Sequence, residues 1–217
     1  MVIVGLTGGV ATGKSMVAAF FKELGAYMID WDELAREVVR PRLKAWKEIV
    51  EYFGKTILND DFTINRQKLA NMVFSNKEKL AMLNQIVHPR VFREDERLTN
   101  EIRRLDPDAV IIKDIPLLFE VSRPIFVDKV VVVSASEHIQ LRRLKEKGMS
   151  RQDAQNRIRS QLPLEKKVKS AHFVINNDGT PEETKRQVEE IYSLLRKGTK
   201  HGEQRVRRGP SRKIGRR

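Results

Sequence analysis

Residues 4–15 read VGLTGGVATGKS and are the most informative stretch of the chain. It contains Gly8-x-x-x-x-Gly13-Lys14-Ser15, the spacing typical of a phosphate-binding loop, or P-loop. Glycines let backbone N–H groups converge on phosphate oxygens, because a side chain would block that approach. The stretch therefore predicts a binding site for a nucleoside triphosphate; a purely structural glycine-rich turn is the alternative.

The segments on either side of the loop suit this chemistry. Residues 2–6 form an apolar run typical of a buried strand, and helical periodicity follows from Lys14 until Gly25. The N-terminus of that helix adds partial positive charge. Lys14 can reach the β- and γ-phosphates, and the Ser15 hydroxyl can bind Mg²⁺. We expect the nucleotide to contact nine consecutive residues: Gly8, Gly9, Val10, Ala11, Thr12, Gly13, Lys14, Ser15 and Met16.

Apolar runs and helical patterns alternate along the rest of the chain. Further strands are predicted at 26–29, 109–114, 128–133 and 172–176, and helices at 32–39, 44–53, 66–74, 76–87 and 90–105. This alternation indicates an α/β fold of the P-loop nucleoside triphosphate hydrolase kind, with a parallel five-stranded sheet flanked by helices. Two helical segments, about 31–87 and 137–168, are longer than simple crossovers, so we expect a substrate-binding segment and a lid there.

Capping patterns mark the starts of four helices. Each pairs a serine or threonine with an acidic residue three positions later. They are Ser75 with Glu78, Ser134 with Glu137, Ser150 with Asp153, and Thr180 with Glu183 around Pro181. The second predicts a helix ending at Gly148, and the third a helix ending near Pro163.

Length and composition limit the class of protein. The 217 residues suffice for one domain with a sizeable core. No cysteine is present, which excludes disulfides, thiolate metal sites and a cysteine nucleophile. No run approaches 18 apolar residues and no signal-peptide pattern opens the chain, so we expect a cytoplasmic protein without a membrane segment.

The positive charge is concentrated at the end of the chain. Residues 199–217 contain eight Lys or Arg and one Glu, a net charge of +7 out of +13 for the whole chain. Their low apolar content predicts a disordered basic tail after a domain spanning 1–198. The tail is either a solvated extension or a weak, non-specific contact for nucleic acid or another polyanion.

A second informative stretch, IDWDELAREVV, occupies residues 29–39. Asp30 and Asp32 follow the second predicted strand, where the carboxyl ends of parallel strands border the ligand crevice. A carboxylate there could accept the proton of a hydroxyl that attacks the γ-phosphate. Alternatively, one of the two caps the helix that follows, and both roles can coexist.

A third stretch, LRRLKEKGMSRQDAQNRIRS at residues 141–160, is rich in arginine and lysine. Kinases need mobile cations that close over the transferring phosphoryl group and exclude water. A solvated basic helix pair is the alternative. The guanine-reading NKxD motif of GTPases is absent, since Asn176-Asn177-Asp178 lacks the lysine.

Taken together, the chain resembles the dephospho-CoA kinase family. The matching stretches are GLTGGVATGKS, IDWDELAREVV, His88-Pro89, DIPLLFE (114–120), VVVVSASEHIQLRRL and RSQLPLEKKVKSAHFVINNDG, in that order over about residues 1–195. The resemblance implies ATP-dependent phosphorylation of the ribose 3′-hydroxyl of dephospho-CoA, the last step of coenzyme A synthesis. It also implies a nucleotide-kinase-like core with CoA-binding and lid segments.

The resemblance assigns roles position by position. It implies that Asp32 is the catalytic base, that Lys14 and Arg143 act on the ATP phosphates, and that Asn177 lies near the adenine. The implied dephospho-CoA site consists of Thr7, Asp32, Arg36, Arg66, His88, Pro116, Leu117 and Leu118. Judged without the resemblance, His88 suits a core or capping position equally well, and Arg36, Arg66 and Asn177 suit the surface.

Four positions depart from the family pattern. Trp31 replaces a small residue, Lys147 an arginine, His172 an aspartate, and Arg42 the glycine expected after Pro41. Trp31 could reshape the substrate pocket, and Lys147 loses bidentate contact with phosphate. Asp114, after the third strand, is a candidate for holding Mg²⁺ through water or for capping its loop.

Two rival functions remain open. One is another small-molecule P-loop kinase that acts on a nucleoside or nucleotide. The other is a non-catalytic, nucleotide-gated RNA-binding protein that uses the basic tail, although such a switch needs no catalytic base.

Overall fold

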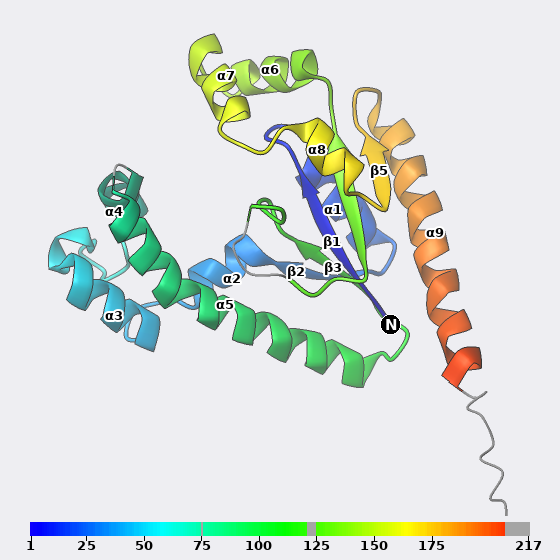
Figure 1. The fold of residues 1–217 in the computed structure, drawn as a ribbon, viewed down its shortest axis with the longest axis horizontal. Coiled ribbons are helices and arrows are strands. Elements are labelled where there is room, and N and C mark those ends of the chain that lie inside the picture. The colour runs from blue at the N-terminus through cyan, green and yellow to red at the C-terminus, as the bar shows by residue number, and fades with distance from the viewer. Residues whose placement is uncertain (75, 121–124, 207–217) are drawn as a thin grey trace, which may run out of the picture. The chain divides into compact units, whose positions relative to one another are not determined.

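Strands and helices alternate along the chain, as the apolar runs predict (Figure 1). The structure, a computed structural model, describes residues 1–74, 76–120 and 125–206. The strands are β1 (Val2–Gly8), β2 (Tyr27–Asp30), β3 (Val110–Asp114), β4 (Lys129–Ser134) and β5 (Phe173–Asn176). The helices are α1 (Lys14–Glu23), α2 (Trp31–Glu37), α3 (Lys44–Phe53), η1 (Lys55–Ile57, a 3₁₀ helix), α4 (Arg66–Phe74), α5 (Lys77–Leu105), α6 (Glu137–Glu146), α7 (Arg151–Arg159), α8 (Leu164–Lys169) and α9 (Pro181–Val206).

The strands form one sheet in the order β2-β3-β1-β4-β5. The pairs β1–β3, β1–β4 and β4–β5 are parallel, with Val4 opposite Ile112 on one side and Lys129 on the other. Strand β1 therefore lies in the middle of the sheet and carries the P-loop at its carboxyl end. The predicted α/β class and five-stranded parallel sheet are confirmed.

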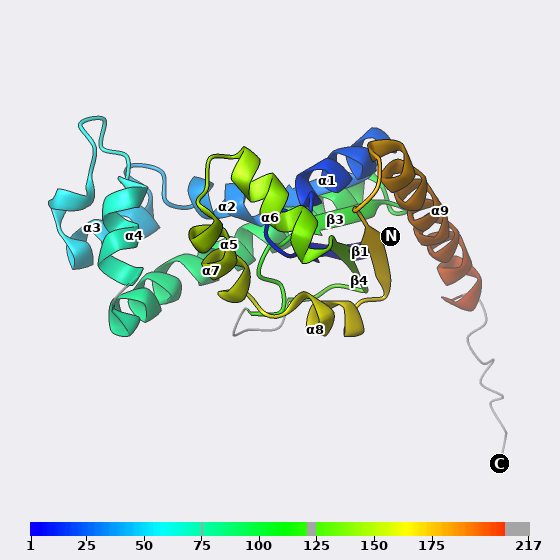
Figure 2. The same cartoon turned by 90° about the horizontal axis from the view of Figure 1, so that it is seen from above.

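Helices cover both faces of this sheet. Helices α1 and α9 pack together on one face, and α8 lies over β4 on the other (Figures 1 and 2). Alternate strand residues such as Val4 and Leu6 join Phe21 of α1 and Val188 of α9 in one buried cluster. Because both faces are covered, the central strands consist of near-continuous apolar residues, as parallel sheets require.

The chain forms two compact units, and residues 29–101 make up the second. Its core is separate and gathers apolar side chains from α3, η1, α4 and α5, among them Ile49, Phe53, Ile57, Leu69 and Ile86. In α3 the buried positions are Ala45, Ile49 and Phe53, four residues apart, which is the spacing of one helix face. The first unit contains the remaining residues, including the P-loop and α6–α9.

The sequence predicts two helices at 76–87 and 90–105, and this prediction is wrong. Helix α5 continues without a break from Lys77 to Leu105 and contains Pro89. Proline removes one backbone donor and usually bends or ends a helix. Here the guanidinium of Arg90 donates to the Ile86 carbonyl and also pairs with Glu48 at 2.7 Å, which supplements the backbone bonding around the proline.

Two of the four predicted capping patterns are confirmed. The Asp153 N–H donates to Ser150 Oγ at 3.1 Å, and Thr180 and Glu183 bond each other reciprocally. The prediction for Ser134 is wrong: this residue ends β4, and α6 begins after Ser136 and ends at Glu146. Ser75 lies outside the described residues, and Asn76 caps the start of α5 through the Lys79 N–H.

Two helix ends differ from their predicted positions. Helix α7 ends at Arg159, and the separate helix α8 follows Pro163. Helix α9 extends to Val206, so the domain boundary predicted at Gly198 falls inside a helix. Residues 207–217 of the basic tail lie outside the described residues.

Candidate nucleotide and acceptor sites

The phosphate loop joins β1 to α1 and has the backbone shape that an anion needs. Ala11 and Gly13 have left-handed backbone, with φ of 58° and 89°. Alternation of left- and right-handed residues turns successive N–H groups toward one concavity. Among the described residues no side chain caps α1 at Gly13, so the N–H groups of its first turn can bind an anion, and its dipole favours negative charge there. The loop therefore fits a nucleoside triphosphate.

The side chain of Asn177 holds the P-loop backbone. Its Nδ2 donates to the Thr12 carbonyl at 2.7 Å, and its Oδ1 accepts from the Thr184 hydroxyl at 2.9 Å. A methyl group at Gly13 would lie 2.0 Å from Asn177 Nδ2, so only glycine fits this close approach. Asn177, Thr12 and Thr184 are all buried. The structure thus joins the loop to Asn177; contact between Asn177 and the nucleotide stays a prediction.

Arg143 of α6 lies against the same loop. Its guanidinium donates to the carbonyls of Ala11, at 3.2 Å, and Asn177, at 2.9 Å. Guanidinium carries five N–H donors, so further donors remain for a phosphate group. The sequence prediction groups Arg143 with the P-loop, and the structure brings the two together.

Lys14 forms an ion pair with Asp114, at the carboxyl end of β3. Both side chains are largely covered. The pair holds the ammonium at the first turn of α1, where the resemblance implies contact with phosphates. Asp114 thus has a contact that neither sequence-based alternative, Mg²⁺ binding nor loop capping, includes.

The loop 116–120 follows β3 and packs beside the P-loop strand. The Thr7 hydroxyl donates to the Pro116 carbonyl at 3.0 Å. A methyl group at Gly5 would lie 2.8 Å from Leu118 Cδ2, so the bare backbone of Gly5 lets Leu118 approach β1. Leu117 is exposed. The predicted substrate residues Thr7, Pro116, Leu117 and Leu118 therefore form one local group.

Three residues outside the predicted site, Gln161, Lys167 and Glu120, make contacts that involve these loops. Gln161, between α7 and α8, accepts a hydrogen bond from the Val10 N–H at 2.9 Å. Lys167 of α8 pairs with Glu120 at 2.8 Å. All three lie in stretches that match the family, DIPLLFE and RSQLPLEKK, but no local pattern indicates which distant loop each side chain contacts.

The other predicted site residues belong to the second unit. Asp32 is exposed in the first turn of α2, and Arg36 is exposed in its last turn. Arg66 is the exposed first residue of α4. His88 is half-buried on α5, and burial lowers its pKa from the ordinary value, which favours the neutral imidazole.

The capping question at residues 29–39 has a clear answer. Asp30 Oδ1 accepts from the N–H groups of Asp32, at 2.8 Å, and Glu33, at 3.1 Å, so Asp30 is the cap. Trp31 is held by α5: its indole N–H donates to Asp95 at 3.1 Å, and its ring meets Phe92 edge-on. Asp32 therefore follows two anchored residues.

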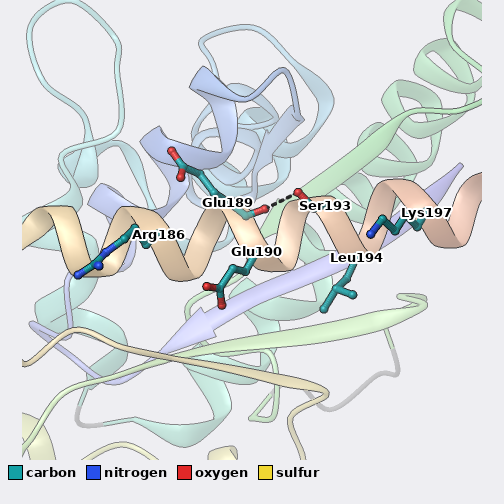
Figure 3. Close-up of a pocket in the computed structure, with 6 residues that line it drawn as sticks. All are labelled: Arg186, Glu189, Glu190, Ser193, Leu194 and Lys197. Carbon is teal, nitrogen blue, oxygen red and sulfur yellow. Dashed lines mark hydrogen bonds between the residues drawn. The ribbon is translucent and has the colours of Figure 1, made fainter.

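A surface hollow of about 460 Å³ lies along α9 (Figure 3). Its lining residues are Arg186, Glu189, Glu190, Ser193, Leu194 and Lys197. All come from one face of one helix, and none belongs to the predicted site. We assign the hollow no role.

The described residues contain neither a cluster of metal ligands nor a helix suited to a membrane. No three His, Cys, Asp or Glu side chains gather there as ligands for an ion. Mg²⁺ does not require such a cluster, because it is usually bound through one or two protein groups plus substrate phosphates. In the same residues, no helix combines the length and hydrophobicity needed to cross a bilayer.

Comparison with known proteins agrees with this geometry. Residues 2–183 match the family model of dephospho-CoA kinase, which is most of the chain. The chain belongs to the dephospho-CoA kinase family.

Named members of the dephospho-CoA kinase family cover nearly the same length. The dephospho-CoA kinase of Carboxydothermus hydrogenoformans is 44% identical over 196 residues, 90% of this chain and 93% of that protein. That of Bacillus thuringiensis subsp. konkukian is 47% identical over 191 residues, 88% and 95% of the two chains. The crystal structure of TT1252 from Thermus thermophilus is 32% identical with a TM-score of 0.75, and covers 89% of this chain and 97% of its own.

Proposed function

We propose that this protein transfers the γ-phosphoryl group of ATP to the ribose 3′-hydroxyl of dephospho-CoA, giving coenzyme A and ADP. Identity of 44–47% to named dephospho-CoA kinases over nine-tenths of the chain carries this proposal. The P-loop with its Lys14, and Arg143 against it, supply backbone N–H groups and positive charge for the phosphates of ATP. The reaction forms a bond between O3′ and the γ-phosphorus and breaks the bond to the β–γ bridging oxygen.

Asp32 is proposed as the general base. Its carboxylate would take the proton of the 3′-hydroxyl as O3′ attacks. Lys14, Arg143 and the first N–H groups of α1 would balance the charge of the transferring phosphoryl group. Arg36, Arg66, His88 and the 116–120 loop are proposed to bind dephospho-CoA.

We propose that the Ser15 hydroxyl binds Mg²⁺ beside the ATP phosphates and that Asp114 holds the ion through water. Ser15 is exposed in the first turn of α1, and Asp114 ends the neighbouring strand β3. When bound, Mg²⁺ would neutralise phosphate charge and orient the γ-phosphate for in-line attack. Location in the cytoplasm and polyanion contact by the tail stay predictions.

A coupled assay of ADP release tests this function. We expect turnover with dephospho-CoA to exceed turnover with each member of a nucleoside and nucleotide panel by at least a hundredfold. Mass spectrometry should find the product 3′-phosphorylated. Preference for a nucleoside would instead identify another small-molecule kinase, and ATP binding without turnover on any acceptor would favour the nucleotide-gated binding protein.

A further inference from the structure

The segment between α7 and α8, residues 160–163, contacts the P-loop through the side chain of Gln161. Gln161 Oε1 accepts the backbone N–H of Val10 at 2.9 Å, and 151 positions separate the two residues in the chain. Gln161 is half-buried. The hydrogen bond therefore connects residues 160–163 to the P-loop at Val10, rather than to α7 or α8.

This bond helps to set the shape of the P-loop. Val10 and Thr12 both donate their N–H groups within the protein, Val10 to Gln161 and Thr12 to the Gly9 carbonyl at 3.3 Å. The left-handed residues Ala11 and Gly13 alternate with them. Loss of the Gln161 acceptor would leave the Val10 N–H without this partner and make the P-loop more mobile. A mobile loop binds phosphate less well, because its N–H groups must be ordered on binding.

The next residue along the chain contacts the 116–120 loop. The Leu162 N–H donates to Glu120 Oε1 at 3.2 Å. Lys167 of α8 places its ammonium 2.8 Å from the same oxygen. The Lys167 side chain is fully buried, and its ammonium has no partner with hydrogen-bond geometry among the described residues. The ion pair with Glu120 is therefore the contact that balances its charge. A buried ammonium without a partner would destabilise the folded protein, so the ion pair fixes the position of the Glu120 carboxylate.

We propose that this junction, defined as Gln161, Leu162 and Lys167, couples ATP binding to acceptor binding. Gln161 acts on the P-loop through Val10, and Leu162 with Lys167 acts on the 116–120 loop through Glu120. All three are positioning residues. Because consecutive residues hold the two loops, ordering of one loop by its ligand reduces the ordering that the other ligand must induce. The acceptor half of this inference rests on the proposed function.

The coupling is measurable by calorimetry with Mg²⁺, a non-hydrolysable ATP analogue and dephospho-CoA. Each ligand is titrated alone and in the presence of the other. We expect each to bind wild-type protein several-fold more tightly when the other is bound, by the same factor in both orders, because linkage is reciprocal.

Three variants assign this coupling to the junction. Gln161→Leu should weaken the analogue about three- to tenfold, the range expected for one lost hydrogen bond, and reduce the coupling factor toward one. Lys167→Met should weaken the binding of dephospho-CoA and reduce the coupling factor. The affinity for the analogue in the absence of dephospho-CoA should not change. Gln152→Leu on α7 is the matched control, because its carboxamide donates to Asn156 of the same helix rather than to either loop.

Clear results would overturn the proposal. Unchanged coupling in both junction variants would do so, and so would tighter analogue binding by Gln161→Leu, which would mean that Gln161 competes with phosphate. If Lys167→Met does not fold, the double variant Lys167→Met with Glu120→Gln takes its place, since it removes both charges together and keeps an oxygen for the Leu162 N–H. If wild-type protein binds the analogue but not dephospho-CoA, the proposed function and the coupling both fail. Weaker binding of the analogue by Gln161→Leu than by Gln152→Leu would then support only the role of Gln161 in positioning the P-loop.

Discussion

Asp30 Oδ1 accepts a hydrogen bond from the backbone N–H of Asp32 at 2.8 Å, so the two aspartates of IDWD have different tasks. Asp30 caps α2, and Asp32 exposes its carboxylate in the first turn. Helix capping therefore needs no contribution from the Asp32 side chain. The separation supports the proposal that Asp32 is the catalytic base.

Substitution of each aspartate by asparagine tests this division. Asp32→Asn removes the proton acceptor and should lower turnover about 10²–10⁴-fold, with little change in melting temperature. Asp30→Asn should be milder in turnover, and because asparagine caps helices about as well as aspartate, its stability should also be near that of wild type. A larger loss of turnover in Asp30→Asn would show that the base is assigned to the wrong residue.

Lys14→Ala should abolish measurable phosphoryl transfer, with a loss of at least about 10²–10³-fold. The variant should stay folded, since the ion pair with Asp114 is one of many contacts of the strand end. Steady-state turnover with ATP and dephospho-CoA, together with circular dichroism, measures both effects. Near-native turnover would contradict the role of Lys14, and Lys22→Ala on the same helix is the control.

Thr184→Val should weaken ATP binding although Thr184 lies on α9, away from the loop in sequence. The change keeps the shape and removes the hydroxyl that donates to Asn177 Oδ1, which leaves a buried acceptor without its donor. We expect a stability loss of about 1–3 kcal/mol and a several-fold weaker affinity for an ATP analogue. Thr184→Ser keeps the hydroxyl and should restore the affinity; equal defects in both variants would contradict the hydrogen-bond explanation.

Arg42→Gly should stabilise the protein. Arg42 has φ of 72°, in the left-handed region, which costs non-glycine residues about 1–2 kcal/mol. Part of that gain is offset by the greater freedom of glycine in the unfolded chain, so we expect about 0.5–1 kcal/mol in urea unfolding. Arg42→Ala removes the same side chain but keeps the strain, and should show no gain. An equal gain in both variants would point to the charge instead.

The half-buried His88 should make stability depend on pH. Burial lowers its pKa in the folded protein below the ordinary value of about 6.5, so the unfolded chain binds protons first as the pH falls. His88 should therefore cost nothing above its ordinary pKa and destabilise the protein progressively as the pH drops below it. Urea unfolding at pH 7.5 and 5.0 should show a smaller loss for His88→Gln than for wild type; an equal loss would contradict the prediction. His138→Gln is the matched control.

Local patterns were enough for the sheet and the P-loop. Parallel strands such as β1 and β4 are buried on both faces, so each is a continuous apolar run that can be found without knowing its neighbours. The P-loop likewise needs a glycine spacing, a strand before it and a helix after it, all within about twenty residues. For the same reason the reciprocal cap at Thr180 and Glu183 could be predicted, since its partners are three residues apart.

The distant side chains that hold the loops could not be found from local patterns and are known from the three-dimensional packing alone. The carboxamide of Asn177 supports Thr12 from 165 positions away, and Gln161 reaches Val10 across 151. No periodicity encodes such pairs, because their partners meet only after the sheet has assembled. The same holds for Pro89 within α5. A local rule predicts that the helix breaks there, but the helix is continuous, and long-range contacts such as that of Arg90 with Glu48 lie beside the proline. Short-range chemistry thus determined the elements of this protein, and packing between elements determined how its loops are held.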